Sequence, residues 1–543
     1  MTYSTPIRLA ELMAALSVAT DMGTGQPLEF AQSACVLAMR LGEQLGLNDT
    51  QLREVYYQAL LRYIGCNAET HLAAAIVGDE LVLRREFAQI DNGKTPEIMG
   101  LMVRLIREAH SGDSTLQVAR AVMQGFMMIG RLPASFADHC EVAQRLAERF
   151  GFSGSILVAL GQLYERWDGK GMPHKLKGEQ VALSVRVVSL AQDAVVFQRL
   201  GDVAAAVQMV RERRGSAYEP RIADTFCRQA AQLMAGLERE PTWDAVLALE
   251  PAEHTSLSET QFDAACEAFA DFVDIKSPYT LGHSRGVAEL AALAAQQPGW
   301  SALDAKDVWR AGLLHDIGRT GVSSGIWDKA GPLSEREWEK VRLHPYYTKR
   351  VLARPEELAR LGAIAALHHE RLDGSGYHRA LPAALLPPAA RILAAADVYR
   401  AMGEARPHRP ALAPAAAAAE LLREAKAGRL DGDAVNSVLA AAGQRGDARR
   451  QVGDLPHVRA DDLRPSAARR ESPGGLTDRE VDVLRLVARG NSNKEIARQL
   501  IVAPKTVDNH VQHIDAKLHV STRAAATLFA VERHLLPEID YPA

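Results

Sequence analysis

The chain has 543 residues, of which 47% are apolar and 24% are charged, and its net charge is −4. It is too long for a single hydrophobic core, so we expect three or four domains. The charge excludes a protein that is basic throughout, although it does not exclude a small module with a basic face. No run of about 18 apolar residues occurs, so we expect no membrane span. The five cysteines are scattered without a CxxC pair, which favours a reducing cytoplasm.

Apolar residues recur with helical spacing in segments such as VAELAALAA, EIARQL and TVDNHVQHIDAKL, so we predict an all-α chain. An internal repeat runs through most of it. Three pairs of residues lie 205 positions apart: His139 and His344, Asp168 and Asp373, Arg186 and Arg391. ALLRYIG at 59–65 parallels GLLHDIG at 312–318, but at an offset of 253. We therefore predict two tandem copies, 15–240 and 260–442, with an insertion of roughly 48 residues within 66–138 of the first.

The first copy keeps a glycine-rich loop, LYERWDGKGMPHKL at 163–176, but lacks most metal-ligating residue types. Where the second copy has histidine and aspartate, the first has Gln32, Arg62, Tyr63, Leu163, Tyr164 and Gln192. Only His139 survives, opposite His344, and one histidine cannot hold two metals. We expect no hydrolysis there, although a fold can persist without its chemistry. Two uses stay open: a structural partner for the second copy, or a sensor that binds a nucleotide or another ligand beneath the insertion.

The second copy carries histidines and aspartates, several of them at the ends of apolar runs. They are His283, His315, Asp316, His344, His368, His369 and Asp397. Polar groups at such positions are costly unless they are paired or bound to a metal. Imidazole and carboxylate together suit divalent iron, manganese or zinc. The set exceeds what one tetrahedral site needs and fits two metals with a bridging carboxylate, an arrangement that activates water and supports in-line phosphoryl displacement.

The ligand order, with SPYTLGHSRGVA, LLHDIGRTGV, HHERLDGSGYHRAL and PPAARILAAADVYRAM, resembles the HD-GYP family of HD-domain metal phosphohydrolases over about 265–410. The resemblance implies a helical fold, two divalent metals (iron or manganese first) and hydrolysis of cyclic di-GMP or a related cyclic dinucleotide. It makes all seven residues metal ligands, with Asp316 as the bridge. It also implies catalytic roles for His315, Asp316 and Arg319, and substrate contacts by Arg319, Asp373, Gly374, Gly376 and Tyr377.

Three departures from the family pattern qualify this resemblance. Arg319 stands where the family usually has lysine, and its planar fork is not equivalent to a compact ammonium group. GYP becomes Gly376-Tyr377-His378, which removes a stiffening proline. Tyr279 stands where three-metal members carry a glutamate, so we expect two metals.

The remaining residues form a linker and a compact helical unit. Residues 443–475 are rich in Arg, Asp, Pro and Gly, and we predict a flexible linker. In 476–536, Thr477 with Glu480 and Ser492 with Glu495 are capping boxes that begin two helices, and Pro504 suits the first turn of a third. The third helix has a buried stripe and a polar outer face, as in a helix-turn-helix domain that enters the major groove.

This unit is similar throughout to the LuxR-type DNA-binding domain, through LTDREVDVL, GNSNKEIARQL and KTVDNHVQHIDAKL. The resemblance places these residues at DNA: Lys494, Lys505, Thr506, Asp508, Asn509, His510 and Gln512. Asn and Gln can pair with adenine edges. The unit is not strongly basic, so a helical interaction module is the alternative, whereas a dimer would compensate for weak binding by each subunit.

We therefore predict tandem helical HD-type domains followed by a four-helix helix-turn-helix domain in a cytoplasmic, homodimeric transcriptional regulator. Its partners are double-stranded DNA and a cyclic dinucleotide, which the second copy hydrolyses. The alternative is a non-catalytic transcription factor in which the HD-type domain senses a nucleotide or metal. Product formation, as against retention of intact ligand, distinguishes the two.

Overall fold

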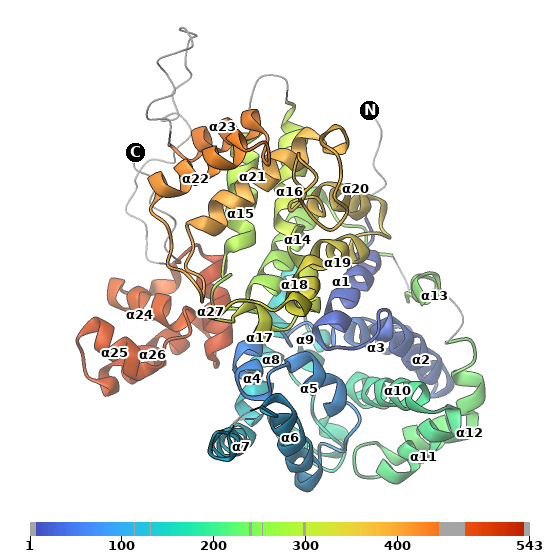
Figure 1. Ribbon diagram of the computed structural model, residues 1–543. Coiled ribbons are helices and arrows are strands. Elements are labelled where there is room, and N and C mark those ends of the chain that lie inside the picture. Colours follow the sequence, from blue (N-terminus) through green and yellow to red (C-terminus); the bar gives the residue numbers. More distant parts are fainter. Residues whose placement is uncertain are drawn as a thin grey trace. The chain divides into compact units, whose positions relative to one another are not determined.

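The computed structural model describes residues 7–112, 114–130, 132–237, 242–251, 254–296, 300–444 and 473–536. Within these ranges every regular element is a helix (Figure 1), and β contacts are confined to isolated bridges. This confirms the all-α prediction. The chain divides into two compact units, here called unit 1 (Met1–Thr280 with Leu313–Ala366) and unit 2 (Leu281–Gly312 with Leu367–Ala543). Because the second copy contributes to both, the units do not follow the repeat.

The first copy lies wholly in unit 1, where α10 packs against α2 and α3. An Asn48 capping box begins α3, with the Gln51 amide donating to Asn48 Oδ1 over 3.0 Å. The large side chains of Tyr56 and Tyr57, both on α3, are fully buried. The helices of this copy are α1 (Leu9–Gly23), α2 (Phe30–Gln44), α3 (Asp49–Leu61), α8 (Leu132–Arg149), α9 (Ser155–Leu160), η1 (Gly178–Gln180), α10 (Leu183–Leu200), α11 (Val203–Arg213) and α12 (Pro220–Leu233).

Residues 66–138, the range within which we predicted the insertion, contain four helices between α3 and α8. They are α4 (Thr70–Val77), α5 (Glu80–Phe87), α6 (Thr95–Ala109) and α7 (Thr115–Ile129). Ile98, Leu101, Leu105 and Ile106 of α6 form a buried cluster with Val77 of α4. The insertion therefore has a small hydrophobic core of its own. A short helix, α13 (Thr242–Ala248), follows the first copy.

The second copy repeats the order of elements. Its helices are α14 (Glu259–Asp274), α15 (His283–Ala294), α16 (Ala302–Leu314), η2 (Ile317–Gly321), α17 (Ser324–Trp327), α18 (Glu335–Arg342), α19 (His344–Val351), α20 (Glu356–Ala365), η3 (Ala383–Leu385), α21 (Pro388–Met402), α22 (Pro414–Lys426) and α23 (Gly432–Ala441). η1 and η3 lie 205 residues apart, and α2 and α15 begin 253 residues apart. The tandem repeat is thus present in the secondary structure.

A buried ionic network attaches the insertion to residues of the second copy within unit 1. Lys276 Nζ lies 2.7 Å from Glu80 Oε1, and both residues are almost fully buried. Ser323 Oγ donates to Glu80 Oε2 over 2.6 Å, and the Ser324 amide donates to Oε1 over 2.9 Å. Lys276 and the Ser323 hydroxyl offset the desolvation of Glu80 and lower the pKa of that carboxyl to about 2.

The C-terminal domain is the predicted bundle of four helices, α24 (Asp478–Ala488), α25 (Asn493–Leu500), α26 (Pro504–Leu518) and α27 (Arg523–Glu532). Both predicted capping boxes are formed, at Thr477 and at Ser492. Val507 and Ile514 of α26 are fully buried in its core. Most of the predicted linker, 445–472, lies outside the described residues; η6 (Pro473–Gly475) follows it.

Among the described residues, no helix combines the length and apolarity that crossing a membrane requires. All five cysteines are free thiols.

Candidate metal centre and DNA-binding helices

Three of the predicted metal ligands meet in unit 1. The apolar run of α16 ends at Leu314, and His315 and Asp316 follow it before η2 begins. The Asp316 carboxylate lies between two imidazoles, with Oδ2 3.5 Å from His315 Nε2 and Oδ1 3.4 Å from His344 Nε2. All three side chains are buried. A carboxylate with one oxygen toward each imidazole is the arrangement that a bridging ligand requires.

Hydrogen bonds and close backbone packing fix the positions of His315 and His344. His344 Nδ1 lies 2.7 Å from the carbonyl oxygen of Val341, a bond in which the ring nitrogen donates and Nε2 keeps its lone pair. Thr348 Oγ1 donates to the His315 carbonyl over 2.8 Å. A Cβ atom on Gly318 would lie 2.0 Å from the His344 carbonyl oxygen, so only glycine allows this approach.

Arg319 lies against the same carboxylate. Its Nη1 donates to Asp316 Oδ2 over 3.0 Å, and its Cζ lies 3.9 Å from the centre of the Trp327 ring. The Trp327 ring in turn contacts His344 edge-on, at 5.5 Å between centroids. The guanidinium is therefore held by an ion pair and a cation–π contact.

A second group of predicted ligands lies in unit 2, on α15 and α21. His283 Nε2 is 3.2 Å from Asp397 Oδ1, and Nδ1 is 2.9 Å from Glu404 Oε2. Arg400 and Arg406 also contact Glu404, at 3.1 and 2.8 Å. The two carboxylates outweigh burial and raise the pKa of His283 to about 10, while His283 and the arginines lower that of Glu404 to about 2.

Sequence reasoning missed Glu404. Its carboxylate orients the His283 ring from the side opposite Asp397, as a second-layer carboxylate does for a metal-binding histidine. Glu404 lies 121 residues from His283 and in no recognisable motif, so no spacing pattern could have found it.

His368, His369 and the glycine-rich loop also lie in unit 2. The two imidazoles are 4.2 Å apart, and Tyr377 stacks on His369 at 4.7 Å. Buried Glu370 fixes the loop, because it accepts hydrogen bonds from the amides of Arg379 and Leu381 at 2.8 and 2.9 Å. The loop therefore holds Tyr377 beside a predicted ligand.

The other predicted substrate residues shape this loop. Asp373 is exposed, and its Oδ1 accepts from the Ser375 amide over 3.0 Å and from the Ser375 hydroxyl over 2.6 Å. Gly374 has a φ of +76°, which suits glycine. A Cβ on Gly376 would lie 2.5 Å from Glu370 Cα. Their contact with substrate stays a prediction.

The donor set fits a divalent cation. Both groups place imidazole nitrogens beside carboxylate oxygens, which are ligands that iron, manganese and zinc accept. The first copy differs, because its described residues contain no cluster of three histidine, cysteine or carboxylate side chains that could hold a metal. There Gln32 Nε2 donates to the Ala14 carbonyl over 3.0 Å, and Arg62 Nη1 donates to Ser189 Oγ over 3.1 Å.

The predicted DNA-contacting residues lie on α25 and on α26, the second helix of the helix-turn-helix. Five are exposed: Lys494, Lys505, Thr506, Asn509 and Gln512. His510 is half-buried. Asp508 is also half-buried and accepts a hydrogen bond from Asn493 Nδ2, so part of its carboxylate serves the packing of α25 on α26.

Comparison with known proteins identifies relatives of both parts. Residues 267–434 match the HD domain family, and 475–530 match the family of bacterial regulatory proteins of the luxR type. The chain is 32% identical over 410 residues to 3′3′-cGAMP-specific phosphodiesterase 3 of Vibrio cholerae, covering 74% of this chain and 88% of that protein. Its fold matches the crystal structure of a cyclic GMP-AMP specific phosphodiesterase of V. cholerae, with a TM-score of 0.56 and 27% identity over 82% of this chain and 99% of that one.

Two further relatives match one part each. The cyclic di-GMP phosphodiesterase response regulator RpfG of Xanthomonas campestris is 36% identical over 161 residues, which is 29% of this chain and 42% of that protein. The transcriptional regulatory protein YhcZ of Bacillus subtilis is 44% identical over 86 residues, which is 16% of this chain and 40% of that protein.

Proposed function

Because this chain belongs to the family of HD-domain cyclic-dinucleotide phosphodiesterases and also carries a LuxR-type DNA-binding domain, we propose that it is a transcriptional regulator whose second copy hydrolyses 3′3′-cyclic GMP-AMP. The enzyme class follows from the HD-domain family, and the DNA-binding domain follows from the match to the luxR family. The substrate is the proposal.

One observation carries the choice of cyclic GMP-AMP over cyclic di-GMP. The alignment with the cGAMP-specific enzyme runs over 410 residues, so it must include part of the first copy. The match to the cyclic di-GMP phosphodiesterase RpfG, by contrast, covers 161 residues. This longer match supports a tandem arrangement that is common to this chain and the relative named for cyclic GMP-AMP.

We propose the seven predicted residues of the second copy as ligands of two divalent metals, iron or manganese. When bound, such metals lower the pKa of water and neutralise charge on the phosphate. The ligand order and the donor chemistry in each unit support this assignment. Asp316 is the proposed bridge, and Glu404 positions His283.

Arg319 supplies positive charge beside Asp316 while Trp327 holds its guanidinium plane. We assign Arg319 to a phosphate of the substrate, and we keep Tyr377 and the loop around Gly376 as proposed substrate contacts. The proposed output is DNA binding by α26 through Asn509 and Gln512, with the lysines at phosphates, in a homodimer. The domain boundaries 15–240, 260–442 and 476–536, and a cytoplasmic location, belong to the same proposal.

Purified full-length protein loaded with iron or manganese tests this function. It is incubated with 3′3′-cyclic GMP-AMP and, separately, with cyclic di-GMP, and the products are separated by chromatography. We expect linear dinucleotide or mononucleotides to form faster from cyclic GMP-AMP, and not at all with the His315→Ala/Asp316→Ala variant. Faster cleavage of cyclic di-GMP overturns the substrate assignment.

The non-catalytic alternative has one observation in its favour, the replacement of the loop proline by His378. It predicts that the metal-loaded protein retains intact cyclic dinucleotide after gel filtration. Retention without product would establish the alternative and refute hydrolysis.

A further inference from the structure

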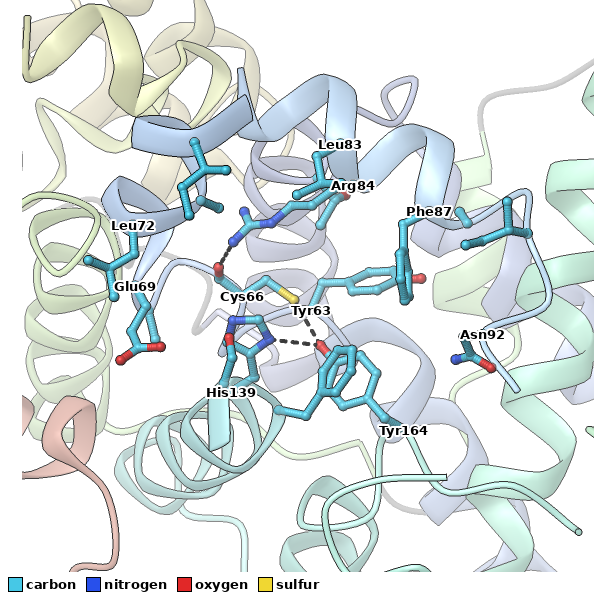
Figure 2. Close-up of a pocket in the computed structure, with 18 of the residues that line it drawn as sticks. Tyr63, Cys66, Glu69, Leu72, Leu83, Arg84, Phe87, Asn92, His139 and Tyr164 are labelled. Carbon is cyan, nitrogen blue, oxygen red and sulfur yellow. Dashed lines mark hydrogen bonds between the residues drawn. The ribbon is translucent and has the colours of Figure 1, made fainter. Parts of the chain in front are cut away.

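The first copy contains a cavity lined by residues that correspond to the metal-ligand positions of the second (Figure 2). Its volume is about 660 Å³, within the range of pockets that hold small organic molecules. Four of the lining residues stand opposite predicted ligands of the second copy: Arg62, Tyr63, His139 and Tyr164. In the first copy, hydrogen-bonding side chains that do not form a metal site therefore line a cavity at the positions of the metal ligands.

Helices α4, α5 and α7, all from the range that contains the insertion, supply the apolar wall. Leu72 and Ile76 of α4, Leu83 and Phe87 of α5 and Met127 of α7 line the cavity. Leu72 and Met127 are 42% and 61% exposed, so the mouth of the cavity presents apolar surface to water. Exposed apolar side chains around a pocket are typical of a ligand-binding site. These helices therefore give the cavity a mainly apolar wall.

The floor of the cavity is polar but uncharged. The Tyr164 hydroxyl lies 3.2 Å from both Cys66 Sγ and His139 Nδ1 (Figure 2). Desolvation and the charge of Arg84 lower the pKa of His139 to about 3, so the imidazole is neutral at physiological pH. Burial raises the pKa of the Cys66 thiol. These groups offer hydrogen bonds without adding charge.

Two guanidinium groups give the lining its excess charge. Arg84 donates Nη1 to the Gly23 carbonyl over 2.7 Å and Nη2 to the Cys66 carbonyl, both of which are neutral acceptors. Arg62 donates to Ser189, and its buried Nε has no hydrogen-bond partner among the described residues. Neither arginine pairs with a carboxylate in the part of the chain that the structure describes.

The acidic groups of the lining do not cancel this charge. Asp193 lies 3.3 Å from Arg213 and is thereby paired. The Glu69 carboxylate points away from Arg84 (Figure 2). A cationic group in a largely apolar pocket is stabilised by an anion that brings a charge-assisted hydrogen bond.

We propose that this cavity binds a small organic acid with an apolar body, the carboxylate at Arg62 and the body between α4, α5 and α7. A nucleotide, with charged phosphates and a polar sugar, suits this mainly apolar lining less well. The proposal does not depend on hydrolysis by the second copy, so failure of one leaves the other standing.

Fluorescence of 8-anilinonaphthalene-1-sulfonate, an aromatic anion, is the probe, measured with the full-length protein. Decanoate and the uncharged 1-decanol then compete with the dye. We expect decanoate to displace it at a concentration about tenfold below that of 1-decanol, because only the acid can form the charge-assisted bond. Arg62→Gln should remove that difference while 1-decanol competes as before.

A matched pair of variants checks that the signal comes from the cavity. Ala75 lines the cavity and is exposed, so Ala75→Trp blocks the mouth without disturbing a core. Ala204 is exposed on α11 and lies outside the lining, so Ala204→Trp is the control. We expect dye binding to fall about tenfold in the first and to stay unchanged in the second. Equal binding by both variants overturns the site, and equal displacement by acid and alcohol overturns the choice of an acid.

Discussion

The two copies share a framework and differ in the side chains that it presents. Buried Glu165 accepts from the amides of His174 and Leu176 at 2.7 and 2.9 Å, as Glu370 does in the corresponding loop of the second copy. A Cβ on Gly65 would lie 1.8 Å from the carbonyl oxygen of His139, just as one on Gly318 would clash with His344. The close approaches and loop anchors therefore persist where the metal ligands do not.

The contrast is sharpest at Asp316 and Tyr63, which stand at equivalent positions. The Asp316 carboxylate faces two imidazoles, whereas burial raises the pKa of the Tyr63 phenol to about 12, so it stays neutral. A neutral phenol beside Arg62 does not attract a divalent cation. The chemistry of each copy thus depends on a few side chains and not on the framework.

The largest expected effect separates these two positions. Asp316→Ala should lower the rate of cyclic dinucleotide hydrolysis by at least about 10⁴-fold, since the bridging carboxylate is lost. Tyr63→Ala should leave the rate within about twofold. Both rates are measured by chromatography with saturating metal. A comparable loss in Tyr63→Ala would mean that the first copy takes part in catalysis.

A second prediction concerns the insertion, the main structural difference between the copies. Glu80→Ala leaves Lys276 buried without its carboxylate, so we expect the free energy of unfolding to fall by about 3–5 kcal/mol. Chemical denaturation of the two proteins measures the difference. Glu86→Ala is the control. Glu86 lies on the same helix and forms an ion pair with the exposed Arg104, so its loss should cost about 0–1 kcal/mol.

The same network predicts a pH dependence. The pKa of Glu80 in the folded state is about 2, below its ordinary value of 4.5. Its contribution to stability is therefore fully present above about pH 5 and is lost as the pH falls toward 2. The wild-type stability should decline more steeply over this range than that of Glu80→Gln, measured by thermal unfolding. Parallel curves would show that the ion pair does not form.

The loop anchors form a matched pair. Glu370→Ala and Glu165→Ala each leave two loop amides without their carboxylate acceptor, and each should cost about 2–3 kcal/mol of unfolding free energy. Only Glu370→Ala should also lower hydrolysis, because only that loop holds Tyr377 beside a predicted ligand. Comparing the catalytic rate at a temperature where both variants are folded separates the two effects. Loss of activity in both would contradict independent roles for the copies.

The parts of this molecule that sequence predicts are those with a local or repeated signal. Capping boxes at Thr477 and Ser492, and the constant offsets between the copies, depend on residues a fixed distance apart. Glu80 with Lys276, and His283 with Glu404, are separated by 196 and 121 residues and leave no such pattern. From the sequence, a ligand site in the first copy was one of two alternatives. The cavity itself could not be predicted, because its wall comes from helices whose packing no motif encodes.

The smallest expected effect concerns Arg319, where the chain departs from its family. A lysine there keeps the charge beside Asp316 but has no planar group to stack on Trp327. We expect Arg319→Lys to reduce kcat/KM by about tenfold or less, and Arg319→Ala by about 100-fold. Trp327→Leu removes the stacking together with the edge contact to His344, so its effect should be at least as large as that of Arg319→Lys. If the lysine variant were as impaired as the alanine variant, the fork geometry of arginine and not its charge would be what the substrate phosphate requires.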